Sequence, residues 1–283
     1  MNYHHIYHAG NFADVLKHAA LVSILLHLRK KEKPFAVIDT HAGRGLYDIT
    51  GAEAAKTDEA KNGILCLLDA GTLPGALENY CGIVHEFGEG YYPGSPLIVA
   101  KLLRPQDGLT AIEMQPGEYA ALAVALAKQP RTRAVQGDGY KELQRLLPPP
   151  ERRGLILIDP PYESDDEFVE SARALVQAHR RFATGIYLFW YPLKTRGLAD
   201  AAAGEVLNAG IGDVLRIELD VDVDPATARE GRGPPLSATG LLVINPPFGF
   251  ETEMSVILPF LKAKLARGPN ARFRLERLAD ETR

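Results

Sequence analysis

The fold class can be inferred from one segment, Gly154-Leu155-Ile156-Leu157-Ile158-Asp159-Pro160-Pro161-Tyr162. Residues 155–158 are a continuous apolar run, which is typical of a strand covered on both faces of a parallel sheet. The run stops at Asp159, and the two prolines that follow cannot donate hydrogen bonds to a neighbouring strand. The sequence therefore predicts a central parallel strand with a carboxylate at its carboxyl end.

Further apolar runs of the same kind alternate with helical patterns along the chain. The last two predicted strands have no helix between them, so we expect them to be antiparallel neighbours. Alternating strands and helices indicate an open doubly wound α/β sheet of Rossmann-like type. The seven predicted strands are 35–38, 109–112, 133–135, 155–158, 185–190, 214–221 and 240–244, and the predicted helices are 11–31, 116–128, 165–181, 198–209 and 251–267.

The connection between the first two strands is much longer than an ordinary crossover. Within it, residues 47–92 are mostly helical in pattern, over 53–69 and 76–87. We therefore expect two units: residues 1–46 together with 93–283 form the main domain, including the N-terminal helix, and residues 47–92 form an inserted helical subdomain.

The chain has 283 residues, 46% of them hydrophobic, and a net charge of −4. No apolar run reaches the roughly 18 residues that a membrane span needs. The first five residues are polar and aromatic, unlike a secretory signal peptide. Two cysteines, Cys66 and Cys81, are too few for a disulfide framework or a four-cysteine zinc site. A cytoplasmic, monomeric protein without a membrane segment is expected.

Two groups of residues have ordinary explanations. The histidines near the start lack the accompanying cysteines or carboxylates of a metal site, so no metal is expected. The basic clusters at 29–31, 152–153, 180–181 and 272–283 are interpreted as solvated helix ends or loops. Residues 222–237, rich in Asp, Gly and Pro, are predicted to form a mobile loop.

Four predicted strands end at an acidic residue: Asp39, Glu113, Asp138 and Asp159. Ligands of open α/β sheets bind at these carboxyl ends. Position 48, where a dinucleotide fingerprint would carry a third glycine, is an aspartate, and no P-loop motif is present. In this fold class the Glu113 carboxylate would hold the diol of a ribose, and Asp138-Gly139 could accept a hydrogen bond from an adenine amino group. Together they indicate an adenosine-containing cofactor without phosphates, and S-adenosylmethionine fits. The simpler alternative is that each acid caps a helix.

Asp159, Pro160 and Tyr162 are the predicted catalytic residues. The Asp159 carboxylate and the Pro160 carbonyl can each accept one hydrogen of an exocyclic amine, while Tyr162 stacks on the ring. The amine lone pair would then point at the methyl group of the cofactor. The same four residues can form a plain turn. A similar motif, at residues 245–248, follows the final antiparallel strand and is predicted to lie outside the cofactor crevice.

Several motifs together resemble the family of 23S ribosomal RNA adenine-N6 methyltransferases of the RlmJ type. The matching segments are Tyr3, residues 8–11, 13–18, 39–43, 92–96, 152–162 and 190–192. The resemblance implies that His18, His41, Ser95, Glu113, Asp138, Gly139 and Asp159 contact the cofactor. It also implies that Tyr3, Lys17 and Tyr162 contact the substrate base, and that Asp159 is the catalytic acid–base residue.

The resulting prediction is an S-adenosylmethionine-dependent enzyme that methylates N6 of one adenine in 23S rRNA. The base would leave its stack to enter the pocket. Methylation of DNA adenine or of a protein glutamine would use the same motif. From a different class, a catalytically silent RNA-binding scaffold would keep the fold and lose the chemistry.

Overall fold

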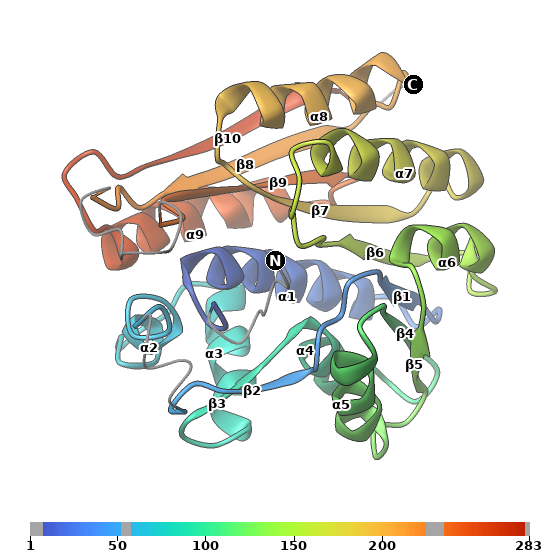
Figure 1. Ribbon diagram of the computed structural model, residues 1–283, viewed down its shortest axis with the longest axis horizontal. Helices are drawn as coiled ribbons and strands as arrows, with labels where there is room; N and C mark the ends of the chain where they lie inside the picture. The colour runs from blue at the N-terminus through green and yellow to red at the C-terminus, as the bar shows by residue number, and fades with distance from the viewer. Residues whose placement is uncertain (1–7, 52–57, 225–234, 281–283) are drawn as a thin grey trace.

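The computed structural model describes residues 8–51, 58–224 and 235–280. Its main sheet has eight strands in the order β10-β8-β9-β7-β6-β1-β4-β5 (Figure 1). These strands are β1 (Ala36–Asp39), β4 (Gly108–Glu113), β5 (Thr132–Gln136), β6 (Gly154–Ile158), β7 (Ile186–Pro192), β8 (Val214–Asp220), β9 (Ala238–Ile244) and β10 (Arg272–Ala279). A separate antiparallel pair joins β2 (Leu46–Asp48) to β3 (Tyr91–Pro93).

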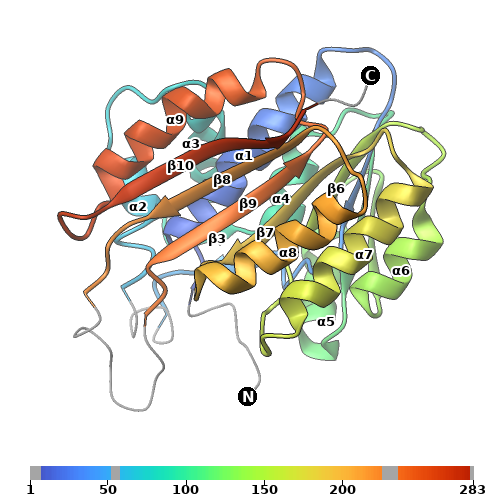
Figure 2. The same ribbon diagram turned by 90° about the horizontal axis from the view of Figure 1, so that it is seen from above.

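Helices cover both faces of the sheet, as Figure 2 shows from above. The helices are α1 (Phe12–Arg29), α2 (Ile64–Leu68), α3 (Ala76–Glu86), α4 (Ser95–Leu102), α5 (Pro116–Leu126), α6 (Gly139–Leu146), α7 (Glu167–Arg181), α8 (Arg196–Asn208) and α9 (Phe250–Leu265). The predicted doubly wound α/β architecture is confirmed.

Alternation along β6 divides the core into two clusters. Leu155 and Leu157 belong to the cluster that includes α1, α3, α4 and α9. Ile156 and Ile158 belong to the cluster that includes α6, α7 and α8. Successive side chains of a strand point to opposite faces, so an uninterrupted apolar run is what a strand between two helical layers requires.

The sheet has one strand more than the seven predicted. β10 pairs antiparallel with β8 at the edge, through the segment that we interpreted as part of a basic C-terminal cluster. Its sequence alternates basic or acidic residues with Phe273, Leu275 and Leu278. An edge strand with a solvated face carries such charges readily. The expected antiparallel pairing of β8 with β9 is confirmed.

The predicted helix over 53–69 is wrong in its described part, where only α2 is helical. A Cβ atom on Gly63 would lie 2.1 Å from the carbonyl oxygen of Gly10, and Ile64 N donates to that same oxygen at 2.8 Å. This close contact with the chain before α1 takes the place of a longer helix. The division of the chain at 47–92 remains a prediction, and most of the predicted loop 222–237 lies outside the described residues.

The order of strands reverses between β1 and β6. From β1 the chain continues to β4 and β5 on one side, and then returns to place β6 on the other side of β1. Both neighbours are parallel to β1, so the ends of β1 and β6 lie next to each other. Ligands of open α/β sheets bind at such a switch point. Asp39 and Asp159 therefore mark the place where a site is expected.

Candidate functional site

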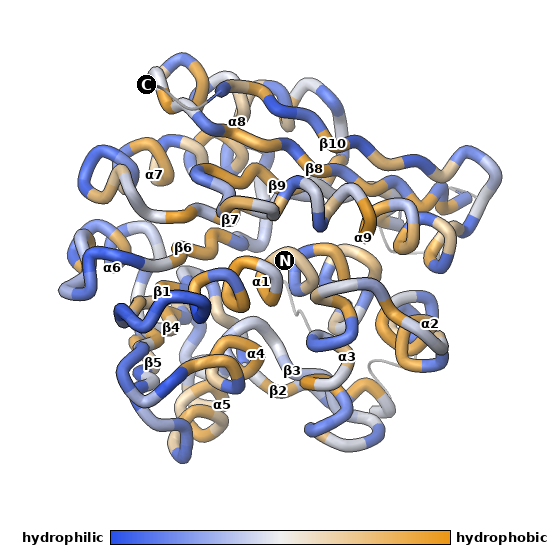
Figure 3. The backbone as a smooth tube through the Cα atoms, turned by 180° about the vertical axis from the view of Figure 1, so that it is seen from behind, coloured by the Kyte–Doolittle hydropathy of each residue, from blue (hydrophilic) through white to orange (hydrophobic). Residues whose placement is uncertain are grey.

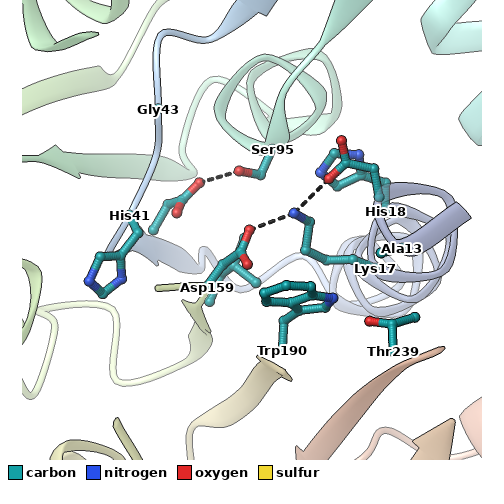
Figure 4. A network of polar contacts seen from close by, with 12 residues as sticks. Ala13, Lys17, His18, His41, Gly43, Ser95, Asp159, Trp190 and Thr239 are labelled. Atoms are coloured by element: carbon teal, nitrogen blue, oxygen red, sulfur yellow. Dashed lines mark hydrogen bonds and ion pairs between the residues drawn. The ribbon is translucent and has the colours of Figure 1, made fainter. Parts of the chain in front are cut away.

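Lys17 joins the N-terminal helix to the end of β6. Its Nζ atom donates hydrogen bonds to Asp159 Oδ2 at 2.5 Å and to Asp14 Oδ1 at 2.8 Å (Figure 4). Only 4% of the Lys17 side chain is exposed. Burial by itself lowers the pKa of Lys17, but the two carboxylates more than compensate and hold it above its ordinary value. The site therefore contains a buried ammonium fixed against Asp159.

The start of α1 positions Lys17. Asn11 is the N-cap of the helix, and its Oδ1 atom accepts from the backbone N–H groups of Ala13 and Asp14 at 2.9 Å. The second oxygen of Asp14 accepts from Gly10 N at 2.9 Å. These bonds satisfy backbone donors that a helix start leaves open. Asp14 is thus fixed on both oxygens, one turn before Lys17.

Asp39 and Ser95 form a second buried contact at the switch point. Ser95 lies at the start of α4, and its hydroxyl donates to Asp39 Oδ2 at 2.6 Å. Among the described residues, none donates to Asp39 Oδ1, although this atom is buried. Burial raises the pKa of Asp39 to about 7, and the nearby Asp159 acts in the same direction. One buried carboxyl oxygen is therefore available to a donor that comes from outside the described chain.

Glu113 is held at the end of β4 by two backbone groups. Gly43 N donates to its Oε2 at 2.9 Å, and Gln115 N donates to its Oε1 at 2.8 Å. Burial raises the pKa of Glu113 in spite of these bonds. A carboxylate has about four acceptor positions, so Glu113 can still accept two further hydrogen bonds from a ligand diol.

Asp138 and Gly139 bring the start of α6 against the loop after β1. Asp138 caps α6, because its Oδ1 accepts from Tyr140 N at 3.0 Å and Lys141 N at 3.2 Å. A Cβ atom on Gly139 would lie 2.1 Å from the carbonyl oxygen of Thr40. Only glycine allows this approach. The cap explains part of why an acid stands at this strand end, as the simpler alternative proposed.

His41 lies beside the same loop. Its Nδ1 is 2.8 Å from the hydroxyl oxygen of Thr40, and its ring meets Tyr140 edge-on at 5.0 Å. Burial lowers the pKa of His41 to about 4, although the charge of Asp138 opposes this. The imidazole is therefore neutral at neutral pH and can donate or accept a hydrogen bond without carrying charge.

Gly43 serves the packing of the protein itself. It has a positive φ of 61°, and a Cβ atom there would lie 2.2 Å from the Tyr47 hydroxyl. A side chain at this position would clash with Tyr47, which already occupies the space.

Tyr162 is held firmly beneath the end of β6. Its hydroxyl donates to the backbone carbonyl of Trp190 at 2.7 Å, and its ring centre lies 4.4 Å from that of Phe168. Only 3% of Tyr162 is exposed. The centre of the Trp190 ring also lies 5.7 Å from the Lys17 Nζ atom, and Figure 4 shows the two side chains from close by. Within the described residues, no backbone group donates to the Pro160 carbonyl.

His18 contacts a buried pair of tyrosines. Its Nδ1 lies 2.5 Å from the Tyr92 hydroxyl, and that hydroxyl lies 2.8 Å from the hydroxyl of Tyr80. The rings of His18 and Tyr92 are stacked with centres 5.7 Å apart. His18 is thus fixed in orientation by the segment that precedes α4.

The motif at residues 245–248 lies at the other edge of the sheet. β9 runs antiparallel to β7, which is parallel to β6, so β9 ends where β6 begins. The Asn245 side chain donates to the carbonyls of Ala183 and Gly185 at 2.8 and 2.7 Å. This amide supports a turn, and it is far from Asp159.

Of the predicted site residues, the structure brings Lys17, Ser95 and Asp159 together around the switch point. Tyr3 lies outside the described residues. Two further members, Asp14 and Trp190, were not predicted as site residues. The spacing of Asp14 and Lys17, three apart on one helix, could have indicated the first. The position of Trp190 near the carboxyl end of β7 could have indicated the second.

Comparisons with known proteins show the family of this chain. The family model described as "Ribosomal RNA large subunit methyltransferase D, RlmJ" matches residues 32–276. Two proteins, each named "Ribosomal RNA large subunit methyltransferase J", from Escherichia coli K12 and Haemophilus influenzae, are 41% identical to this chain, and each alignment covers 94% of both sequences. The chain belongs to this family.

A crystal structure of a protein from Legionella pneumophila has the same fold. It superposes with a TM-score of 0.86 at 34% identity, covering 95% of this chain and 98% of that one. Membership of the RlmJ family confirms the predicted Rossmann-like methyltransferase fold, and with it S-adenosylmethionine as the methyl donor. Among the described residues, no helix is long and apolar enough to cross a membrane.

Proposed function

We propose that this member of the RlmJ family transfers a methyl group from S-adenosylmethionine to the N6 amine of one adenine in the RNA of the large ribosomal subunit. The observation that carries the proposal is the pairing of Asp159, in its Asp-Pro-Pro-Tyr motif at the switch point, with the buried ammonium of Lys17. The names of the two relatives support the class of substrate.

The chemistry that we assign to Asp159 and Pro160 uses both hydrogens of the amine. Asp159 Oδ1 accepts one hydrogen and the Pro160 carbonyl accepts the other, which directs the nitrogen lone pair away from both. Lys17 occupies Oδ2, so the carboxylate presents one defined oxygen to the substrate. Orientation and hydrogen bonds that form at the reacting nitrogen are each worth several kcal/mol in such reactions.

The bound cofactor supplies a methyl group on a positively charged sulfur. When bound, the cofactor would give up this methyl group to the amine nitrogen and keep the electrons of the carbon–sulfur bond, and the nitrogen would then lose one proton. The Asp159 carboxylate is proposed to lie beside this nitrogen and to accept the proton. Lys17 cannot take the proton, because it is already an ammonium; its proposed role is to hold the Asp159 carboxylate in place.

The residues at the strand ends fit this cofactor. The cationic and amine groups of the cofactor need hydrogen-bond acceptors. Asp39 Oδ1 is one, since it is buried and accepts no hydrogen bond from the described residues. Glu113 is proposed to hold the ribose, while Asp138 and Gly139 meet the adenine ring. His18, His41 and Ser95 complete the proposed set, with His41 acting as a neutral hydrogen-bonding group.

Contact with the substrate base is proposed for Lys17, Tyr162 and Tyr3. Tyr162 lies directly after the prolines, and its anchored hydroxyl fixes the plane of its ring. The target adenine must leave its stack to approach Asp159, as bases do in other base-modifying enzymes. Trp190, packed against both Tyr162 and Lys17, adds a second aromatic wall to the same place.

The test is transfer of labelled methyl to protein-free large-subunit rRNA, with genomic DNA and ribosomal protein as competing substrates. Label recovered as N6-methyladenosine in the rRNA is the expected result. Label found only in DNA or protein would contradict the proposed substrate, but it would leave the chemistry assigned to Asp159 unchanged. A protein that binds the cofactor and labels nothing would be a silent scaffold.

The role of Asp159 is tested by substitution. Asp159→Ala is expected to abolish transfer while the affinity for the cofactor stays nearly unchanged. Asp159→Asn retains one acceptor oxygen, so its loss of activity should be smaller. Asp165→Asn, at an exposed acid six positions along the chain, is the matched control. Equal loss of cofactor binding and activity in Asp159→Ala would indicate a structural role instead.

A further inference from the structure

The edge of the sheet opposite the proposed active site is strongly basic. The parallel strands begin at this edge, and several helices end there. The turn after α1, residues 30–34, lies beside β1 and is hydrophilic, as Figure 3 shows. The exposed basic residues at this edge are Arg29, Lys30, Lys31, Lys33, Arg131, Arg133, Arg152, Arg180 and Arg181. We call this surface the basic edge.

Two arginines hold the corner of the basic edge in one shape. Arg104 NH1 donates to the carbonyl of Lys31 at 2.9 Å, and Arg153 NH1 donates to that of Lys33 at 2.8 Å. Both guanidinium groups also lie against the ring of Phe35, with centres 5.6 and 5.8 Å away. The turns before β1, β4 and β6 are thereby fixed together.

Ordinary helix capping does not account for these charges. Cations at the end of a helix stabilise its dipole, but Arg153 already donates to the carbonyl of Leu28, and Arg104 to that of Arg29. Among the described residues, none forms an ion pair with Lys30, Lys31 or Arg152. These three exposed cations are therefore available to an anionic partner.

An exposed aromatic side chain stands beside Lys30. Phe248 is 95% exposed, and it lines a hollow of about 360 Å³ together with Lys30, His27 and Asn79. It belongs to the motif at 245–248, which the proposed reaction does not use. Cations next to an open aromatic ring are typical of surfaces that bind single-stranded nucleic acid, where phosphates meet the cations and a base stacks on the ring.

The proposed active edge carries exposed charges of both signs, with Lys141 and Lys194 among its cations. Besides the acids at the strand ends, the exposed residues Glu163, Asp165 and Asp166 follow directly after the catalytic motif. A protein of net charge −4 has to attract a polyanionic substrate through a local basic surface. The described residues offer such a surface at the opposite edge.

We propose that the basic edge binds a second segment of the RNA substrate, at a distance from the adenine that is methylated. Lys30, Lys31 and Arg152 contact phosphates, and Phe248 stacks with an unpaired base. This inference rests on the proposed function for the identity of the RNA. It assigns recognition of a long substrate to a surface that does not touch the reacting base.

The experiment compares two RNAs and two sets of variants. One RNA is a short hairpin that carries the methylated adenine, and the other is a long transcript of the surrounding rRNA domain. The triple variant Lys30→Gln, Lys31→Gln, Arg152→Gln removes three cations of the basic edge. The control variant Arg173→Gln, Lys262→Gln, Lys264→Gln removes three exposed cations of α7 and α9. KM, kcat and binding at several salt concentrations are measured for each.

The triple variant is expected to raise KM for the long transcript at least about tenfold, with kcat and hairpin methylation unchanged. The slope of log K for RNA binding against log salt concentration reflects the number of phosphate contacts. Loss of three contacts should therefore reduce its magnitude by about 2. Phe248→Ser should weaken binding of the long transcript about tenfold, as loss of one stacked base does. Equal effects of both triple variants, or an effect on the hairpin, would overturn the inference. Wild-type protein that fails to methylate either RNA would contradict the proposed function instead.

Discussion

Lys17 Nζ lies 2.5 Å from Asp159 Oδ2, across 142 positions of the chain. The contact joins the first helix of the protein to the end of the central strand β6. Both groups are largely buried, and the ammonium also contacts Asp14. Neither the charge of Lys17 nor the orientation of Asp159 can be changed without disturbing the other.

Lys17→Met should destabilise the folded protein by about 3–5 kcal/mol, because Asp14 would keep a buried charge without its partner. Methyl transfer should fall by far more than cofactor binding. Thermal unfolding and single-turnover methylation measure the two effects. Lys17→Arg keeps the charge and serves as the comparison. A Lys17→Met protein as stable as the wild type would show that the pair is not important for folding.

Asp39 should make stability depend on pH. Its folded pKa of about 7 lies above the ordinary 3.8, so its contribution is fully present below about pH 4 and is lost as pH rises to 7. The loss is on the order of 4 kcal/mol. Asp39→Asn should remove this component. Urea unfolding without cofactor, from pH 4 to 8, should therefore give a difference between the two proteins that grows with pH, whereas parallel curves would contradict the assignment.

Tyr162→Phe keeps the ring and removes the hydrogen bond to the Trp190 carbonyl. Stability should fall by about 1 kcal/mol, the usual worth of such a bond. The fall in kcat should be smaller than for Tyr162→Ala, which also removes the ring and leaves a cavity costing about 3–5 kcal/mol. Steady-state kinetics with rRNA and melting curves separate these effects. Equal kcat values for the two variants would mean that the ring plays no part in the reaction.

Gly139→Ala places a methyl group against the Thr40 carbonyl, so the start of α6 must move. We expect a loss of about 1–3 kcal/mol of stability, and cofactor affinity reduced at least about tenfold, because Asp138 moves with the helix start. Calorimetric titration measures the affinity. Gly82→Ala, in the open interior of α3, is the matched control and should gain about 0.5–1 kcal/mol. Similar affinities for both variants would count against Asp138 as a cofactor residue.

The strands that carry the site could be predicted, because a strand buried on both faces must be apolar throughout. β6 and β1 are such strands, and the rule that parallel strands end at one edge then places Asp39 beside Asp159. β10 was missed because an edge strand has one solvated face, and Arg272 and Arg274 therefore resemble an ordinary basic tail.

The contacts of the site were less accessible to prediction. The rule for strand ends says nothing about a helix that precedes the first strand, so the residues alone did not place Lys17 at Asp159. The resemblance to the family suggested that Lys17 meets the substrate, whereas its contact with Asp14 needed the structure. The hydroxyl of Tyr162 likewise finds its acceptor on β7, 28 positions away.

The burial of α1 has a consequence for the motion of the enzyme. Residues 12–25 are buried on every side of the helix, and amides in such a segment exchange with solvent only when the whole domain unfolds. Lys17 is attached to this slowly exchanging part of the protein. The ammonium therefore cannot follow an incoming base, and in forming the complex it is the RNA that has to change its shape.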